Sequence, residues 1–194
     1  MQKEIIILGV DPGTSITGYG LIKVQNKNIE LIKLGVIQMT KTDDHYLKLK
    51  KIFESILQVI DTYNPDVLAI EAPFFGKNIQ SMLKLGRAQG VSMAAALYRN
   101  IPLVEYSPKK IKQSITGNGN ATKEQVSSML QSLLKFDGHP EFLDATDGLA
   151  AAVCHYLQND VVPLTKTKDK TSKKKHTGWK AFLTENPDKI IKGK

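Results

Sequence analysis

The sequence has one cysteine, two arginines and no long hydrophobic run. Because Cys154 has no second cysteine to pair with, an internal disulfide is excluded and a reducing compartment is indicated. No apolar run exceeds about seven residues, which is too short to cross a bilayer. The opening MQKEIIILGV also lacks the small-residue cleavage site of a signal peptide. We therefore expect a soluble, cytoplasmic protein without a membrane partner.

The basic residues are almost all lysines, and they are unevenly placed. Residues 1–164 carry a net charge of +1, whereas residues 165–194 hold ten lysines and three acids. This contrast predicts a folded domain over 1–164 and a flexible Lys-rich tail over 165–194. Lysine suits phosphate backbones, while arginine favours the reading of guanine edges. A nucleic-acid partner would therefore be recognised mainly by backbone and shape; a tail that only aids solubility is the alternative.

Hydrophobic periodicity predicts an α/β fold. Three consecutive segments have strand patterning and short connections: 4–10, 17–25 and 29–39. After them, helical and strand patterns alternate: a helix over 43–62, a strand over 66–71, a helix over 77–99 and a strand over 102–106. Three more helices are predicted, beginning at Ser107-Pro108, at residue 121 or 122, and at residue 141. This order predicts a mixed five-stranded sheet, its first three strands antiparallel, flanked by helices.

Four carboxylates fall where such a fold can bring them together. Asp11 and Glu71 end the first and fourth strands, and Asp144 and Asp147 share one face of the last helix. Clustered acids repel one another unless a cation lies between them, and hard oxygen ligands suit Mg²⁺ or Mn²⁺. Two such ions, about 3.5–4 Å apart, would activate water for phosphodiester hydrolysis. Singly, Asp11 has a plainer interpretation as a turn residue and Asp144 as a helix cap. Glu71 is harder to explain in this way, because an acid at the end of an apolar run is costly without a partner.

Four separated motifs resemble the RuvC family of Holliday-junction resolvases, in the family's order and spacing. They are GVDPGTSITGYGLI, VLAIEAPFFGKNIQSMLKLGRAQG, YSPKKIKQSITGNGNATKEQV and DATDGLAAAVCH, spread over residues 4–157. The resemblance implies a ribonuclease-H-like fold, a homodimer and Mg²⁺-dependent, paired nicking of four-way DNA junctions in recombination and repair. It also implies the RuvA/RuvB branch-migration complex as a partner.

The resemblance also implies roles for individual residues. The family's catalytic and metal-binding acids correspond to Asp11, Glu71, Asp144 and Asp147. Lys123 and Lys112 match basic residues close to the scissile phosphate, and Phe74 matches an aromatic that contacts unstacked DNA. Because Phe75 follows directly, which of the two phenylalanines contacts DNA stays open. Lys77, in the same segment, is a further expected DNA contact.

Three other functions are compatible with parts of the sequence. A nuclease of the same fold would act on RNA or single strands, and a non-cleaving protein would only bind junctions. An actin-like phosphate binder would use Asp11–Thr14, but it would need a second domain that this chain is too short to hold. One structural question is also open: the small residues Gly86, Gly90 and Ala94, spaced four apart, would face either the sheet or a twin helix.

Overall fold

The computed structural model describes residues 4–26, 28–40, 42, 44–73, 78–136 and 143–159. These residues form strands and helices in the predicted order. The strands are β1 (Ile5–Asp11), β2 (Ile16–Gln25), β3 (Asn28–Gln38), β4 (Val67–Glu71) and β5 (Leu103–Tyr106). The helices are α1 (His45–Tyr63), α2 (Ile79–Tyr98), α3 (Pro108–Thr116), α4 (Lys123–Leu134) and α5 (Leu143–Asn159).

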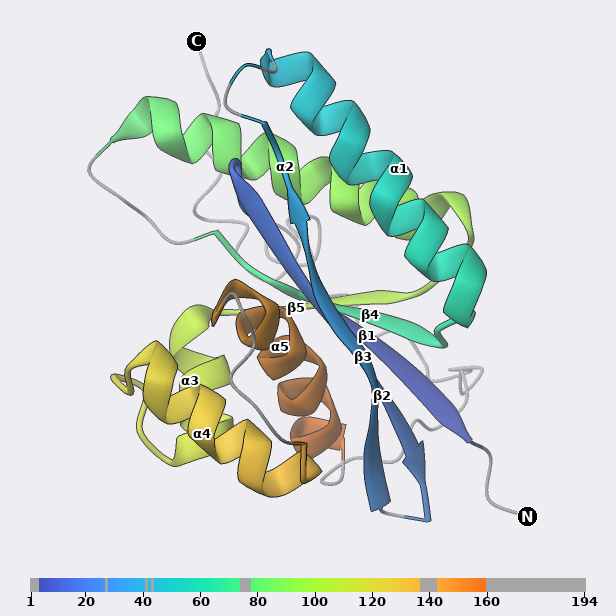
Figure 1. The fold of residues 1–194 in the computed structure, drawn as a ribbon, viewed down its shortest axis with the longest axis vertical. Helices are drawn as coiled ribbons and strands as arrows, with labels where there is room; N and C mark the ends of the chain where they lie inside the picture. Colours follow the sequence, from blue (N-terminus) through green and yellow to red (C-terminus); the bar gives the residue numbers. More distant parts are fainter. Residues whose placement is uncertain are drawn as a thin grey trace, which may run out of the picture. The chain divides into compact units, whose positions relative to one another are not determined.

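The strands form one mixed sheet in the order β3-β2-β1-β4-β5 (Figure 1). β2 pairs antiparallel with both β1 and β3, whereas β4 pairs parallel with both β1 and β5. The predicted fold class is therefore confirmed. Because β1 and β4 are parallel neighbours, their carboxyl ends meet at the same edge of the sheet.

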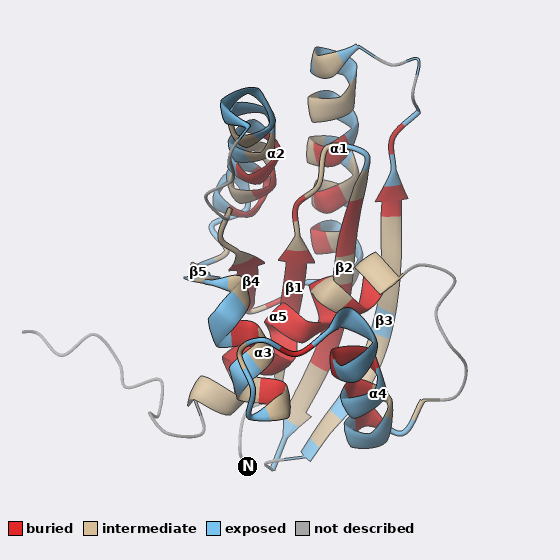
Figure 2. Ribbon diagram, turned by 90° about the vertical axis from the view of Figure 1, so that its left-hand side faces the viewer, coloured by how far each residue is buried: buried red, intermediate tan, exposed pale blue. Residues whose placement is uncertain are grey.

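Helices cover both faces of the sheet, α1 and α2 on one face and α3, α4 and α5 on the other (Figures 1 and 2). Side chains alternate between the two faces along each strand. Ile7 and Val67 pack in the core cluster that contains α5, whereas Leu8 packs in the cluster that contains α1 and α2. With this two-residue period, Asp11 and Glu71 continue the rows of β1 and β4 that face α5.

Helix α5 lies directly on the backbone of β1 and β2, at glycines. A Cβ atom added at Gly18 would collide with the carbonyl oxygen of Asp144, and one added at Gly148 would collide with the backbone of Gly18 and Tyr19. Only a glycine pair allows this approach. The contact fixes the first turns of α5 against β2, next to the carboxyl end of β1.

Side-chain caps explain where the helices begin. Helix α1 starts at His45, two residues later than predicted, because the Asp44 side chain accepts a hydrogen bond from the Leu47 N–H at 2.8 Å. Asn78 caps α2 in the same way through the Ser81 N–H.

None of the described helices is both long enough and apolar enough to span a membrane. Residues 165–194 lie outside the described part, so the predicted domain boundary stays a prediction.

Candidate active site

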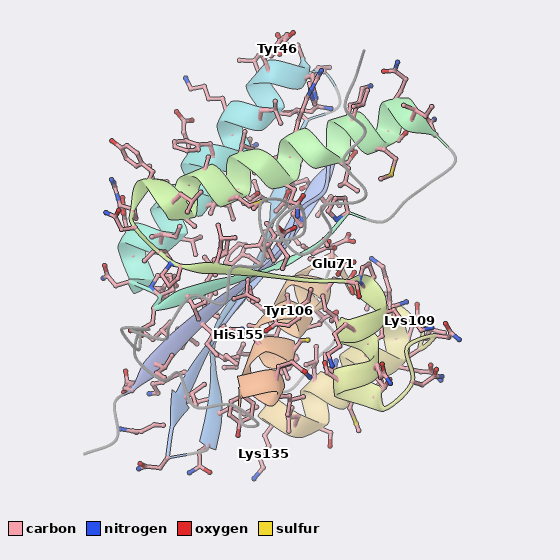
Figure 3. The ribbon with its side chains drawn as sticks, turned by 180° about the vertical axis from the view of Figure 1, so that it is seen from behind. Tyr46, Glu71, Tyr106, Lys109, Lys135 and His155 are labelled. Atoms are coloured by element: carbon pink, nitrogen blue, oxygen red, sulfur yellow. The ribbon has the colours of Figure 1, made fainter. Side chains whose placement is uncertain are left out.

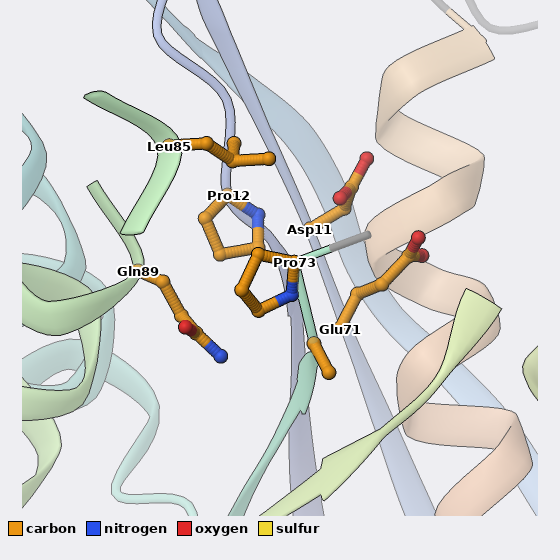
Figure 4. A pocket seen from close by; sticks show the side chains of 7 residues that line it. Asp11, Pro12, Glu71, Pro73, Leu85 and Gln89 are labelled. Atoms are coloured by element: carbon orange, nitrogen blue, oxygen red, sulfur yellow. The ribbon is translucent and has the colours of Figure 1, made fainter. Parts of the chain in front are cut away.

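Three of the four predicted acids lie within reach of a single cation. Carboxylate oxygens of Asp11, Asp144 and Asp147 all lie within 4.8 Å of one another. Glu71 follows the last registered β1–β4 pair, Val10 and Ile70, so it lies beside Asp11. In Figure 4 the carboxylates of Asp11 and Glu71 both point toward α5. The sheet and α5 thus gather acids that are up to 136 residues apart in the sequence.

Burial and mutual repulsion disfavour the ionised form of these acids. Burial, together with the charges of Asp147 and Asp144, raises the pKa of Asp11 to about 7. Burial and the charges of Asp11 and Asp147 raise the pKa of Glu71 to about 8. The pKa of Asp147 is also raised, mainly by burial. A divalent cation would remove this electrostatic cost, and an all-carboxylate donor set fits a hard ion such as Mg²⁺ or Mn²⁺.

Lys123 is in direct contact with the acids. Its Nζ lies 3.1 Å from Oδ1 of Asp144 and also pairs with Oδ2 of Asp147. A capping box fixes the start of α4: Thr122 Oγ1 accepts from the Gln125 N–H, and Gln125 Oε1 accepts from the Thr122 N–H. Lys123, as the first residue of that helix, therefore has a well-defined position at the acid cluster.

Lys112 lies near the acids but does not pair with them. It is half-buried on α3, and its charge lowers the pKa of Glu71 and of Asp147 to a small extent. Among the described residues, no ion pair joins Lys112 to an acid. The expected DNA contacts Phe74, Phe75 and Lys77 lie outside the described residues and stay predictions.

Thr17 is a residue that sequence reasoning missed. It is fully buried, and its hydroxyl accepts from the Gly13 N–H at 3.2 Å and donates to the Gly13 carbonyl at 3.1 Å. These two hydrogen bonds between Thr17 and Gly13 close the turn that follows Asp11. Because the Gly13 N–H already has a partner, the turn has one donor fewer for a phosphate, which weighs against the actin-like alternative. A lone threonine near a Pro-Gly turn gives no sequence signal of this role.

Gln89 is a second missed residue. With Pro12, Pro73 and Leu85 it lines a cavity of about 100 Å³ that borders Asp11 and Glu71 (Figure 4). Its Nε2 donates to Oε2 of Glu105 at 2.8 Å, which fixes the amide at the cavity wall. A single glutamine on the buried, small-residue face of α2 gives no sequence signal of this role.

The small-residue stripe of α2 does not face the sheet. Gly86, Gly90 and Ala94 are exposed, and a Cβ atom added at either glycine would meet nothing within 4 Å. Exposed apolar side chains extend the same stripe on both sides, at Ile79, Leu83 and Leu97. Of the two orientations left open by the sequence, packing on the sheet is therefore wrong.

Known proteins resemble this chain over most of its length. A sequence model described as "Crossover junction endodeoxyribonuclease RuvC" matches residues 7–155. A protein of that name from Christiangramia forsetii is 58% identical over 190 residues, covering 98% of this chain and 95% of the relative. Another from Bacteroides fragilis is 56% identical over 190 residues, covering 97% of both chains. The structure of Thermus thermophilus RuvC with a Holliday junction substrate aligns with a TM-score of 0.76 and 26% identity, covering 81% of this chain and 96% of that one.

Proposed function

The chain belongs to the RuvC family of crossover junction endodeoxyribonucleases, and from this premise we propose how its residues cut DNA. The protein is an endonuclease of four-way DNA junctions, with a role in recombination and repair. We propose that it makes paired, symmetric nicks, with Asp11, Glu71, Asp144 and Asp147 as the catalytic acids of each subunit. The alternatives of a non-cleaving protein or an RNA nuclease have no support from the relatives.

The observation that carries this proposal is the convergence of carboxylates from β1, β4 and α5. Asp11, Asp144 and Asp147 would hold Mg²⁺, and Glu71 would complete the set for a second ion. When bound, such ions activate water and neutralise the charge of the leaving oxygen. Asp144 and Asp147 would also orient the attacking water in line with the scissile bond. Lys123 and Lys112 would donate to the phosphate oxygens, on which negative charge accumulates.

A panel of labelled substrates tests the function. We expect Mg²⁺-dependent nicks in two opposite strands of a synthetic four-way junction. Duplex, single-stranded and hybrid substrates of the same sequence should be cut far more slowly. Equal cutting of single strands or hybrids would favour a different nuclease of this fold, and tight junction binding without cutting would favour the inert binder.

We further propose that two copies associate through α2. The exposed stripe of Ile79, Leu83, Gly86, Gly90 and Leu97 is apolar and has small residues at its centre, which allows two helix backbones to approach closely. A two-fold dimer would present two acid clusters to a junction that is itself two-fold symmetric.

A pair of leucine variants tests this dimer. Leu83→Glu places a charge on the stripe, where Leu83 is 53% exposed, and should convert the dimer into monomers in analytical ultracentrifugation. Leu133→Glu changes a leucine on α4 that is 43% exposed and is the matched control. A dimer that survives Leu83→Glu but not Leu133→Glu would move the interface to α4.

The remaining partners rest on the family resemblance. We propose that the protein cooperates with the RuvA/RuvB branch-migration complex and acts in the cytoplasm, where the chromosome of a bacterium lies. A pull-down of RuvB and RuvA by the full chain, with and without junction DNA, tests the first of these proposals.

We also propose that the Lys-rich segment 165–194 contacts the DNA backbone. Its deletion should then make the salt dependence of junction affinity shallower, because fewer counterions are released on binding.

A further inference from the structure

The ammonium group of Lys123 lies where a cation is required. It pairs with Asp144 and with Asp147, two of the three acids whose oxygens converge within 4.8 Å. Asp147 is only 14% exposed, so water compensates little of its charge. Among the described residues, Lys123 is the cationic side chain that pairs with these acids.

The position of Lys123 is otherwise unfavourable for a lysine. It is the first residue of α4, where the positive end of the helix dipole disfavours a cation. Partial burial works to lower the pKa of Lys123, but the hydrogen bonds and charges of Asp147 and Asp144 outweigh burial and raise it. The two acids are therefore what holds the ammonium group in place.

An ammonium group and a divalent ion cannot share these oxygens at low cost. The hydrogen bonds of Lys123 engage one carboxylate oxygen of Asp144 and one of Asp147, and an ammonium group and a divalent ion bound to the same carboxylates repel each other. We propose that Lys123 is a resident counter-cation of the metal-free protein, that a divalent ion displaces it from Asp144 and Asp147, and that the released ammonium group then binds the phosphate at the cut.

The displacement needs no DNA, whereas the final step rests on the proposed junction cleavage. Metal binding in the absence of DNA therefore tests the inference separately from the function. Lys123 would also set the sequence of events at the site, because its ammonium group can bind the phosphate only after the divalent ion has bound to the acids.

The first experiment measures Mn²⁺ affinity of the full chain by calorimetry without DNA. Removing the competing cation in Lys123→Met should tighten Mn²⁺ binding about tenfold. Lys112→Met removes a nearby charge that touches no acid, and it should tighten binding by less than about threefold. Unchanged or weaker binding by Lys123→Met, or equal effects of the two variants, would overturn the inference.

A second experiment uses the unmodified protein, so it does not depend on the folding of a variant. The rate at which a small acetylating reagent modifies Lys123 is measured by mass spectrometry, with exposed Lys109 as the internal reference. Saturating Mg²⁺ should raise the relative rate at Lys123 several-fold, because the amine leaves its two acids. A relative rate that stays constant or falls on addition of Mg²⁺ contradicts displacement. Junction cleavage measured on the same samples reports separately on the proposed function.

Discussion

The glycines at the α5–sheet contact and those on the outer side of α2 have opposite surroundings. Where α5 meets β1 and β2, a Cβ atom added at Gly9, Gly18 or Gly148 would collide with the backbone of the neighbouring element. On the outer side of α2, Gly86 and Gly90 border open space. The first set of glycines is explained within one chain, since it brings α5 to the acids on the strands. Among the described residues nothing packs against the second set, which is why we propose that it meets another molecule.

The two faces of the sheet differ in electrostatics. The face under α1 and α2 packs apolar side chains such as Leu8, Ile52 and Leu68. The α5 face has a similar core, but at its edge it carries carboxylates whose pKa values are raised. Such repulsion costs stability in the metal-free protein, as is common at functional sites. Four substitutions sharpen the comparison.

The largest effect is expected for Gly18→Ala. The added methyl group would collide with the Asp144 carbonyl, so α5 must move away from β2. We expect the free energy of unfolding in urea to fall by about 3 kcal/mol or more, with loss of cleavage. A loss below about 1 kcal/mol would mean that α5 tolerates a shift and that the glycine contact does not fix the acids.

Asp11→Asn should stabilise the metal-free protein by about 1–2 kcal/mol at pH 7. Folding raises the pKa of Asp11 to about 7, so between about pH 4 and pH 7 the folded state binds more protons than the unfolded one. Stability therefore falls as the pH rises through this window, and the variant lacks the contribution of Asp11 to that fall. Urea unfolding in EDTA at several pH values checks this. If the free energy of unfolding changed with pH in the same way for the variant and the parent protein, the raised pKa of Asp11 would be contradicted.

Tyr106→Phe removes a hydrogen bond between the sheet and α5. The Tyr106 hydroxyl lies 2.8 Å from Nδ1 of His155, and Figure 3 shows the two labelled side chains close together beside α5. We expect a loss of about 1 kcal/mol at pH 7.5. Burial lowers the pKa of His155, so its contribution to stability is present above about pH 6.5 and is lost as the pH falls. Equal stability of variant and parent at pH 7.5 would show that this bond adds nothing.

The smallest effect is expected for Gly90→Ala, on the opposite side of the molecule. Open space at Gly90 accommodates the methyl group, and alanine favours the helix by about 0.5–1 kcal/mol. The isolated subunit should become slightly more stable, while the dimer should weaken because two α2 backbones can no longer approach as closely. Unfolding at low concentration and sedimentation at high concentration separate the two effects. A variant that dimerises more tightly would contradict close helix approach at this residue.

Local patterns were sufficient to predict the elements and the strand ends that carry Asp11 and Glu71. The short apolar runs of β1 and β4 and the caps at Ser107 and Thr122 are short-range features, so they can be read from neighbouring residues. The prediction that α5 carries two acids on one face rests on helical spacing alone.

Contacts between distant elements could not be read in this way. The ion pairs of Lys123 depend on how the start of α4 approaches α5, and the bond from Gln89 to Glu105 depends on the distance between α2 and β5. The orientation of the Gly86–Gly90 stripe likewise depends on which side of α2 meets the sheet. Each of these features is set by the packing of elements that are distant in the sequence. Sequence periodicity predicts which side of an element is buried, but not which residues of two elements meet.

The most direct test of the account is cleavage of a synthetic four-way junction by Asp11→Asn and Glu71→Gln in Mg²⁺, with junction binding measured on the same samples. Both variants should bind the junction at least as tightly as the parent, because a negative charge near the phosphates is gone, and both should fail to nick it. Nicking by either variant at a rate close to that of the parent protein would contradict the assignment of catalysis to these acids.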